Sequence, residues 1–500
     1  MKIGLLCVLV SFITLSVGSA LSESLTYDEV FYLEEGREIL SGGPISDPYN
    51  PPLVPILAGL PIALGWDAWI RSPIPAHKAF FSRMTTVVLG GILILAVYRA
   101  GGLTAAWILA FEPTFLANSH YVTSDVAVAL FVFLAAVSPN TWLVGLSVGY
   151  ALSSKITSLL FLPIVWFFKT VPYGFARPVP AKSGRIVLVA VIILWATHLF
   201  TWDVVIGARE DSSRVSKMLV EYARIHRIFA LEGIVKFFEE QPLPLGTYLA
   251  TVKNNLLRLG RPATVIFDGK LYERPRWYFM IANVLRKVPV PLLILIALGA
   301  GYRQNYAGIG MAIILVVSVV GMVPLVRFAL PAMPFFAVVA GGGIKKIGET
   351  GGIWGKRIVF VLLLWYVVGT LRQYPHFISY ANEFVRPSHR FEVLSDSNLD
   401  WGQALPDITR FARDNVYGRV SLSYFGRDDA TVYGFASDTA YGGWKFEDIC
   451  AFHESVINPK VAQSAEIISI SNWYACGYNT RDAYRKDKIR EVVADAFLVF

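Results

Sequence analysis

The chain has 500 residues, of which 55% are hydrophobic and only 16% are charged. Soluble domains carry about 25% charged residues, so this composition excludes an ordinary soluble globular protein. The formal net charge is +8, but the basic residues lie mainly in short segments between apolar runs, where they set topology. The sequence therefore predicts a polytopic α-helical membrane protein with no nucleic-acid partner.

The first apolar run covers residues 3–21 and follows Lys2. We interpret it as a first transmembrane helix; the alternative is a signal peptide that ends near Gly18-Ser19-Ala20. Both interpretations place residues 22–52 outside, and this segment holds seven acidic residues against one basic residue, Arg37. The outer side therefore begins with an acidic loop, and a short interfacial helix is predicted over residues 53–66.

Ten further apolar runs are predicted to cross the membrane, which gives eleven crossings. With the N-terminus inside, basic residues such as Arg99, Lys169 and Arg303 fall on the cytoplasmic side, as the positive-inside rule requires. The ten runs lie near residues 79–98, 103–119, 121–138, 141–158, 158–170, 186–203, 285–301, 306–325, 328–344 and 358–371.

An odd number of crossings places the end of the chain outside, on the same side as loops 22–78 and 204–284. We therefore divide the chain into a transmembrane domain, residues 1–371, and an extracytoplasmic domain, residues 372–500. Strand-like runs at 420–424, 466–472 and 491–500, with a helical pattern after Trp401, predict a small α/β fold for the second domain. Cys450 and Cys476 lie there and permit one disulfide, whereas no zinc-binding spacing occurs.

Ionisable side chains at membrane depth are costly unless they are paired or hydrated, so each one is a candidate functional residue. Each has a plainer explanation: a solvated acidic loop, a carboxylate that caps a helix, or a lysine that snorkels to the interface. The candidates, all predicted at the outer face, are Asp28, Glu29, His120, Asp125, Lys155, Lys287 and Arg327.

Acids and bases gathered at one outer face suit transfer from a lipid phosphate. A carboxylate orients or deprotonates an acceptor, while cations stabilise a phosphate leaving group as negative charge develops on it. Neither task needs a nucleotide, and the sequence contains no Walker or Rossmann glycine motif.

The order of motifs along the chain resembles the polytopic lipid-carrier-dependent glycosyltransferases of GT-C fold. This superfamily contains the protein O-mannosyltransferases of glycosyltransferase family 39 and the aminoarabinose transferases of lipid A. The resemblance runs almost end to end, and its pieces are residues 27–29, 49–61, 82–83, 112–120, 123–125, 145–155, 277–279, 287–291 and the run Ser395-Asp396-Ser397-Asn398-Leu399-Asp400-Trp401-Gly402-Gln403.

The resemblance implies that Asp28 is the catalytic carboxylate, with Glu29 beside it in the active-site loop. It places Lys155 and Arg327 near the lipid phosphate, together with a basic residue that opens the second span, Arg83. It makes Asp125 the second acidic position of the family. Other candidate site residues are Asn50, His120, Trp277, Lys287, Asn398, Asp400, Trp401 and Gln403.

Three of these candidates have open alternatives. Asn50 stands where family members often carry His or Lys before Pro-Pro-Leu, and an amide cannot neutralise phosphate, so the substrate class is less certain. Trp277 either belongs to an aromatic belt or stacks on a sugar. Asp400 either caps the helix that follows or belongs, with Asn398, Trp401 and Gln403, to a set suited to a sugar.

We therefore expect an inverting membrane glycosyltransferase of the cytoplasmic membrane, which transfers a sugar from a polyprenyl-phosphate donor to an acceptor hydroxyl on the outer face. A transporter or a non-catalytic envelope-assembly protein is the alternative, but transporters usually show repeated halves and midplane charges. The expected partners are the lipid-linked donor, membrane lipids, and a protein, lipid or glycan acceptor. No cofactor is firmly implied, and divalent-metal dependence, the sugar and the acceptor stay open.

Overall fold

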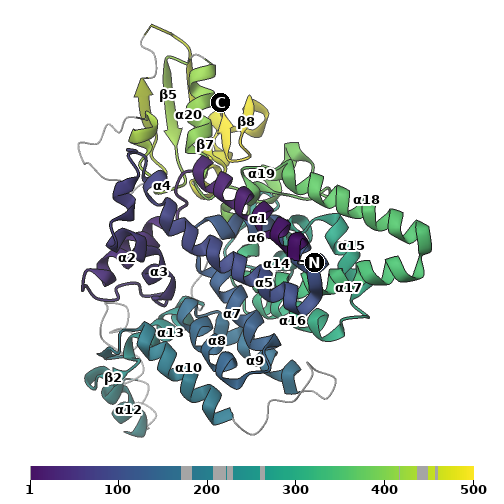
Figure 1. The fold of residues 1–500 in the computed structure, drawn as a ribbon. Helices are drawn as coiled ribbons and strands as arrows, with labels where there is room; N and C mark the ends of the chain where they lie inside the picture. Colours follow the sequence, from purple (N-terminus) through teal and green to yellow (C-terminus); the bar gives the residue numbers. More distant parts are fainter. Residues whose placement is uncertain are drawn as a thin grey trace.

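The computed structural model describes residues 2–170, 183–205, 221, 229–259, 265–415, 417–435, 449–456 and 460–500. Most of these residues are helical, and the five-stranded sheet lies at one end of the molecule, above the long apolar helices (Figure 1). Within the described residues, four helical segments are long and apolar enough to cross a membrane. They are Ile3–Ser22 in α1 (Lys2–Ser22), α5 (Phe80–Ala110), Val326–Thr350, which joins η2 (Val326–Ala332) to α17 (Met333–Thr350), and α18 (Gly352–Leu371). The chain is therefore a polytopic helical membrane protein.

The remaining predicted spans are bent or short. Helices α6 (Pro113–His120) and α7 (Ser124–Val137) meet at 117°, and α14 (Trp277–Lys287) and α15 (Val290–Gly299) meet at 108°. If each bent pair is one span, the described residues hold up to six crossings by length and composition, so the count of eleven stays a prediction. The other apolar helices are α3 (Leu53–Ala63), α8 (Thr141–Ser154), α9 (Ser158–Thr170), α10 (Ser183–Thr197) and α16 (Gln304–Val319).

The boundary predicted between the spans 79–98 and 103–119 coincides with a kink inside α5. Helix α5 passes residue 98 with one non-helical residue, Gly102, whose φ of 80° suits glycine. A second break follows at Glu112, whose side chain accepts from the Phe115 amide at 2.6 Å, and Pro113 then starts α6. An N-cap carboxylate followed by proline is a strong helix start, and here it divides the span predicted over 103–119.

The segment predicted to be the first outer loop, called the first outer segment below, contains a pair of helices, α2 (Glu29–Leu40) and α3, that cross at two glycines. A Cβ on Gly36 would lie 2.0 Å from the Pro55 carbonyl oxygen, and one on Gly59 would lie 2.6 Å from the carbonyl carbon of Gly36. Only glycine permits this approach. A helix is present where one was predicted over 53–66, although it ends at Ala63, and its interfacial location stays a prediction. The short helices η1 (Trp66–Trp69) and α4 (Pro75–Lys78) follow.

The second outer segment packs against the first. The Asn254 and Asn255 side-chain amides donate to the carbonyl oxygens of Pro48 and Tyr49 at 3.1 and 2.9 Å. Both asparagines belong to α13 (Gly246–Leu259), which thus holds the loop that follows α2. The other described elements of this segment are β1 (Trp202–Asp203), α12 (Phe229–Glu240), β2 (Leu243–Pro244), β3 (Val265–Phe267) and β4 (Lys270–Tyr272).

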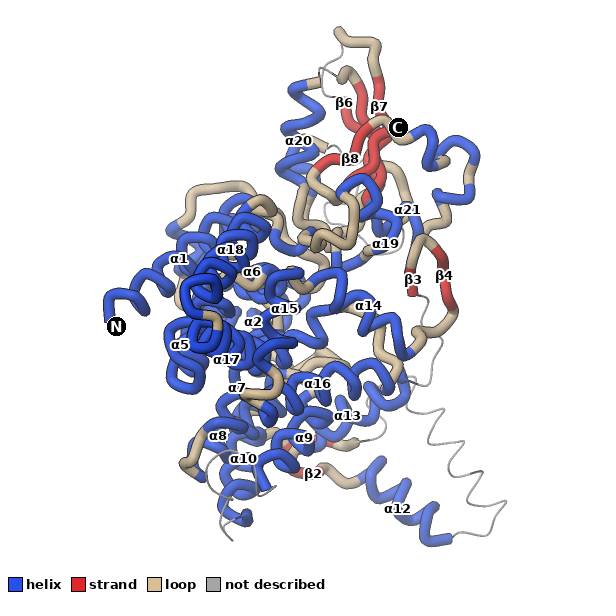
Figure 2. The backbone as a smooth tube through the Cα atoms, turned by 90° about the vertical axis from the view of Figure 1, so that its right-hand side faces the viewer, coloured by secondary structure: helices blue, strands red, loops and turns tan. Residues whose placement is uncertain are grey.

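The last part of the chain forms a five-stranded mixed sheet in the order β6-β5-β7-β9-β8. Figure 2 shows its strands, among them β6, β7 and β8, gathered at one end of the molecule. The three strand-like runs of the sequence fall in β5 (Arg419–Ser423), β7 (Ser464–Ser469), and the hairpin of β8 (Glu491–Val493) and β9 (Phe497–Val499). Strand β6 (His453–Val456) was not predicted, and the run 466–472 turns into α21 (Ile470–Ala475) after Ser469. Helices α19 (Arg390–Val393) and α20 (Leu405–Asp414) complete this part, and Cys450 and Cys476 form the disulfide that the sequence permits.

Candidate active site

Four charged side chains from four separate elements form one connected cluster. Arg327 Nη1 lies 2.7 Å from Asp28 Oδ2 and 3.9 Å from Asp125 Oδ2. Lys155 Nζ lies 2.7 Å from Asp125 Oδ1, so two carboxylates and two cations alternate. We refer to Asp28, Asp125, Lys155 and Arg327 as the charge cluster. All four were candidate residues from the sequence, and the structure brings them together across about 300 residues of chain.

The cluster is open to solvent mainly at Asp28, whose side chain is 29% exposed, against 3% for Asp125. Asp125 Oδ2 and Arg327 Nε are buried and make no hydrogen bond within the described part of the chain. Buried polar groups are almost always hydrogen-bonded, and exceptions ask for a functional explanation. A polar ligand that reaches the cluster therefore meets an acceptor and a donor that the protein itself leaves unused.

The contacts within the charge cluster also test the plainer explanations of these residues, which are a solvated loop or a helix cap for the acids and snorkelling for Lys155. Asp125 pairs with Lys155 and makes no capping bond at the start of α7, where Thr123 is the N-cap residue. Lys155 is largely buried and ion-paired, so it does not snorkel to the interface. Asp28 is the N-cap residue of α2, but its side chain makes no capping bond and is directed instead to Arg327.

Aromatic rings lie against both cations. The Arg327 guanidinium carbon is 4.2 Å from the centroid of the Trp401 ring, and Phe328 lies within 5.3 Å of the same carbon. Lys155 Nζ is 4.5 Å from the Phe328 ring centroid. Such contacts hold a cation by its attraction to the ring face and leave its N–H groups available for anions.

The run from Asp396 to Gln403 holds the segment that carries Asp28. The amides of Ser24 and Tyr27 donate to the carbonyl oxygens of Gln403 and Trp401, each at 2.9 Å. Ser24 Oγ donates to the Gly402 carbonyl at 2.8 Å. Trp401, Gly402 and Gln403 thus bind Ser24 and Tyr27 through their backbone carbonyl groups. These hydrogen bonds fix the position of Asp28, which follows Tyr27 directly.

Asn398 and Lys287 act on the other side of the cluster. Asn398 Oδ1 accepts from the Val326 amide at 2.8 Å, and its Nδ2 donates to the Pro324 carbonyl, so it fixes the turn before Arg327. Lys287 Nζ donates to the carbonyl oxygens of Ile378 and Asn398 at 2.5 and 2.8 Å. Asn398 is thus committed to the backbone before Arg327, and Lys287 to the backbone of Ile378 and of Asn398 itself.

The side chains of Asp400 and Gln403 likewise form hydrogen bonds with backbone groups inside the protein. Asp400 accepts from the amides of Ser471 and Gly402, and it does not cap α20, whose N-cap residue is Ala404. Burial raises the pKa of Asp400 to about 7 in spite of these bonds. Gln403 accepts from the Trp401 amide at 2.7 Å.

Glu29 and Arg83 are not at the cluster, because they pair with each other in the interior. Arg83 Nε and Nη2 donate to the two Glu29 carboxylate oxygens at 2.9 and 2.8 Å, and both side chains have no exposed surface. The other three guanidinium N–H groups donate to the carbonyl oxygens of Ala20, Glu23 and Ser24. A guanidinium has five N–H donors, so Arg83 has none left for a phosphate. The structure gives Glu29 and Arg83 a structural position, and the roles expected from the resemblance do not fit it.

A second buried network was not foreseen from the sequence. Glu23 Oε2 lies 2.6 Å from His120 Nε2 and accepts from the Tyr121 hydroxyl, and Glu23 Oε1 lies 2.8 Å from His376 Nδ1. His376 Nε2 lies 3.1 Å from Asp407 Oδ2. His120, a candidate from the sequence, therefore belongs to this network. The carboxylate at position 23 was not weighed because it stands at the end of an apolar run among six other acids.

The pKa values of the network follow from its pairing. Burial opposes the charged form of Glu23, but the contacts with His120 and His376 outweigh it and lower its pKa to about 2. Burial also opposes the charged form of His376, and the hydrogen bonds to Asp407 and Glu23 raise its pKa to about 10. The pair Glu23 and His376 is therefore ionised at neutral pH.

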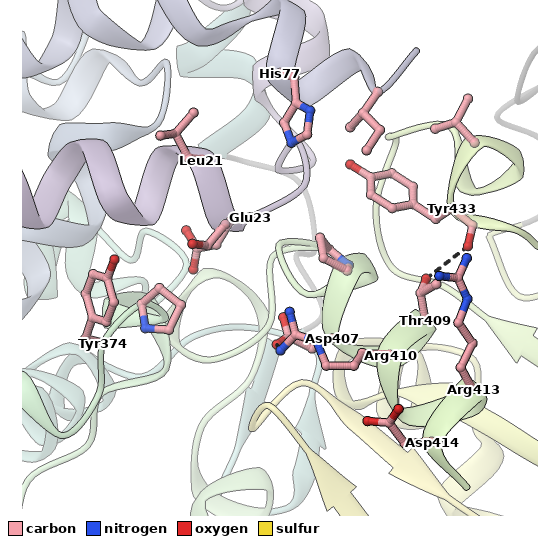
Figure 3. Close-up of a pocket in the computed structure, with 15 residues that line it drawn as sticks. Leu21, Glu23, His77, Tyr374, Asp407, Thr409, Arg410, Arg413, Asp414 and Tyr433 are labelled. Carbon is pink, nitrogen blue, oxygen red and sulfur yellow. Dashed lines mark hydrogen bonds and ion pairs between the residues drawn. The ribbon is translucent and has the colours of Figure 1, made fainter. Parts of the chain in front are cut away.

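A cleft of about 790 Å³ lies beside this network, between the end of α1 and helix α20 (Figure 3). Figure 3 shows Leu21, Glu23 and Tyr374 on one side of it and Asp407 and Arg410 on the other. The residues of the charge cluster do not line this cleft.

Two further candidates lie apart from the charge cluster. Asn50 Nδ2 and its amide both bind the Asp47 carboxylate, at 2.8 and 3.0 Å, so the side chain closes a turn in the outer loop. Trp277 is 62% exposed at the start of α14, with its ring edge-on to Tyr278, and this geometry fits both an aromatic belt and a ring that stacks on a sugar. No group of three or more metal-ligating side chains occurs among the described residues.

Comparisons with known proteins give a structural likeness only. No family model matches the chain, and no curated protein sequence matches it. The chain is similar to the crystal structure of ArnT from Cupriavidus metallidurans bound to undecaprenyl phosphate, with a TM-score of 0.42 and 11% identity over 74% of this chain and 71% of that one. For ArnT from the same organism in the apo state the TM-score is 0.29, with 15% identity over 70% of this chain and 78% of that one. At these values residue roles do not transfer, and the site is interpreted from its own geometry.

Proposed function

We propose that the protein is a membrane glycosyltransferase of GT-C type that transfers a sugar from a polyprenyl-phosphate donor to an acceptor hydroxyl. The observation that carries this proposal is the charge cluster, in which Asp28 is the most exposed acid and stands beside Arg327 and Lys155. An acid next to two cations is what transfer from a phosphate to a hydroxyl requires. The sequence motifs that resemble lipid-carrier-dependent glycosyltransferases supply the same residues.

The proposed reaction is a single displacement with inversion. Asp28 accepts the proton as the O–H bond of the acceptor breaks, and the acceptor oxygen forms a bond to the anomeric carbon. On the opposite face the bond from that carbon to the phosphate oxygen breaks, and its electron pair leaves with the polyprenyl phosphate. Arg327 and Lys155 stabilise the negative charge that develops on this phosphate.

Arg327 links donor binding to the availability of Asp28. Arg327 Nη1 donates to Asp28 Oδ2 at 2.7 Å, so this oxygen is engaged by the guanidinium. A donor phosphate competes for the same guanidinium, and its arrival frees the carboxylate for an acceptor hydroxyl. Arg327 Nε, buried and without a hydrogen bond among the described residues, supplies a further donor. We therefore propose that the donor binds before the acceptor.

The proposed location is the outer face of the cytoplasmic membrane, with the N-terminus inside. The disulfide between Cys450 and Cys476 supports this orientation, because disulfides persist on the oxidising side of that membrane. The distribution of basic residues along the sequence supports it as well.

The test uses the purified protein in lipid with a panel of radiolabelled polyprenyl-phosphate sugars and a cell-envelope extract as acceptor. We expect wild type to remove label from at least one lipid, and Asp28→Asn to do so roughly 10²- to 10⁴-fold more slowly, because a positioned general base contributes about that factor. Glu34→Gln, an exposed acid on the same helix, is the matched control and should behave as wild type. Equal release by Asp28→Asn, or no release by folded wild type from any donor, would refute the proposal.

A further inference from the structure

Two side chains of the extracytoplasmic domain interleave with two from the segment that carries Asp28. The Phe425 and Tyr27 rings stack with centroids 5.2 Å apart and 9° between their planes. The Arg427 guanidinium carbon lies 4.2 Å from the centroid of Tyr27 and 3.5 Å from that of Phe31. The resulting order, Phe425, Tyr27, Arg427 and Phe31, is called the ladder below.

The ladder is built on the segment that carries the proposed base. Tyr27 directly precedes Asp28 and Phe31 follows it by three positions, so both rings belong to the segment at the start of α2, where Asp28 is the N-cap residue. Arg427 Nη2 also donates to the Tyr27 hydroxyl at 2.8 Å, which fixes the guanidinium relative to that ring. A planar guanidinium that stacks on one ring, approaches another and makes a hydrogen bond is held far more firmly than a lysine ammonium would be.

A second contact ties the same two parts together. Asp428 Oδ2 accepts from the Leu25 amide and from the Tyr433 hydroxyl, each at 2.9 Å. Strand β5 ends at Ser423 and leads into a loop, and residues 425, 427 and 428 of this loop all contact the segment 25–31. Arg427 differs from the others in this loop because it brings a positive charge, which interacts with Asp28 and Glu34.

We infer that Arg427 is a positioning residue for Asp28, so that the extracytoplasmic domain forms part of the active site. This inference rests on the proposed function. Without the guanidinium, Tyr27 keeps only its contact with Phe425, and Phe31 loses its contact with Arg427. The backbone at the start of α2 then becomes more mobile. A misplaced carboxylate slows the chemical step, whereas donor binding by Lys155 and Arg327 is largely retained.

The experiment compares Arg427→Leu, Arg427→Lys, Phe31→Leu and the double variant Phe31→Leu/Arg427→Leu. Arg413→Leu, an exposed arginine on α20, is the matched control. We expect Arg427→Leu to lower kcat about 10- to 100-fold while the KM for the donor changes less than about 3-fold. Arg427→Lys should recover only part of the loss. The double variant should be no slower than the slower single variant, because both substitutions break one ladder.

Hydrogen exchange of the full-length protein provides a readout that does not depend on turnover. Amides of residues 24–31 should exchange faster in Arg427→Leu than in wild type, and unchanged in Arg413→Leu. An active wild type with an unchanged kcat or unchanged exchange in Arg427→Leu would overturn the inference, as would a kcat loss that only matches a loss of folded protein. A folded wild type that is inactive with every donor refutes the proposed function instead.

Discussion

Two adjacent acids, Asp28 and Glu29, meet arginines in opposite ways. Asp28 and Arg327 are 2.7 Å apart in a partly open cluster, where Arg327 keeps one buried N–H group that makes no hydrogen bond among the described residues. Glu29 and Arg83 are 2.8 Å apart with no exposed surface, and every N–H group of Arg83 is used. The ion-pair distance is nearly the same in both pairs, so it does not identify the functional one. Accessibility and unused hydrogen-bonding capacity distinguish the two pairs, and both features support Asp28 and Arg327 as the proposed functional pair.

The helix geometry explains how neighbours come to differ. Consecutive residues at a helix start are directed about 100° apart, so only one of two adjacent acids can face the cluster. Glu29 turns inward and also accepts from the amides of Thr26 and Val122, which ties the segment before α2 to the turn between α6 and α7. The buried pair thus holds the frame in which Asp28 and Asp125 approach the same arginine.

The largest effect on stability should come from breaking the buried pair. Arg83→Met leaves Glu29 as an uncompensated buried charge, and the loss of one partner of such a pair costs about 3–5 kcal/mol. We expect a clearly lower thermal midpoint in detergent, with activity per folded molecule changed much less. Lys345→Met, which removes an exposed cation, is the control. An unchanged midpoint in Arg83→Met would mean that the pair is not structural.

An intermediate effect should come from the open cluster. Lys155→Met removes a cation from the proposed phosphate site, and a hydrogen bond to a charged group contributes about 1.5–3 kcal/mol. The KM for the lipid-linked donor should rise roughly 10- to 100-fold, by the same scale. The measurement is initial rate against donor concentration in defined vesicles, with Lys345→Met again unchanged. An unchanged KM for the donor in Lys155→Met would contradict a role of Lys155 in phosphate binding. The role of the lysine would then be to hold Asp125 in place.

The smallest effect should appear as a pH dependence of stability. The pKa of His376 is raised to about 10, so its stabilisation is complete below about 6.5 and is lost as pH rises through 10. The pKa of Glu23 is lowered to about 2, so its stabilisation is complete above about 4.5 and is lost as pH falls through 2. Thermal midpoints should therefore fall on the alkaline side from about pH 7 to pH 10.

The variant His376→Gln separates the contribution of His376 to the pH dependence of stability from the contributions of other titratable groups. The amide keeps a hydrogen bond to Glu23 but cannot carry the charge, so the alkaline decline should become shallower than in wild type. A decline of equal slope in the variant would show that other groups cause it, and His389→Gln, an exposed histidine, serves as the control.

Much of the charge cluster could be predicted from the sequence, because a cation at an outer membrane face is anomalous on the sequence alone. Asp28, Asp125, Lys155 and Arg327 all violate a pattern, and the structure joins them. The sequence does not show whether all N–H groups of an arginine are used in hydrogen bonds within the protein. Arg83 looks as exceptional as Arg327 in the sequence, and only the positions of three carbonyl groups reveal that it is fully occupied.

The fold shows the same limit. The apolar strands of the C-terminal part could be located, but β6, with the sequence His453-Glu454-Ser455-Val456, is mostly polar and was not predicted. The turn of the last hairpin has Ala494 and Asp495 at positive φ, which matches the twist of its strands although neither residue is typical there. The boundary predicted between the spans 103–119 and 121–138 falls where α6 and α7 meet at 117°. Length and composition did not show the bend of 108° between α14 and α15, which lies inside the span predicted over 285–301. Arg427 lies about 400 residues from Asp28 in an ordinary loop, so only the folded chain makes it a candidate.

The most direct test compares Asp28→Asn with Glu29→Gln, two substitutions that keep shape and remove one charge from neighbouring residues. Donor turnover and thermal midpoint are measured on the same preparations. We predict that Asp28→Asn abolishes turnover and melts near the wild-type temperature, while Glu29→Gln melts well below it and its folded fraction still turns over donor. The opposite pattern, with Asp28→Asn active and Glu29→Gln stable but inactive, would contradict the assignment of Asp28 as the base.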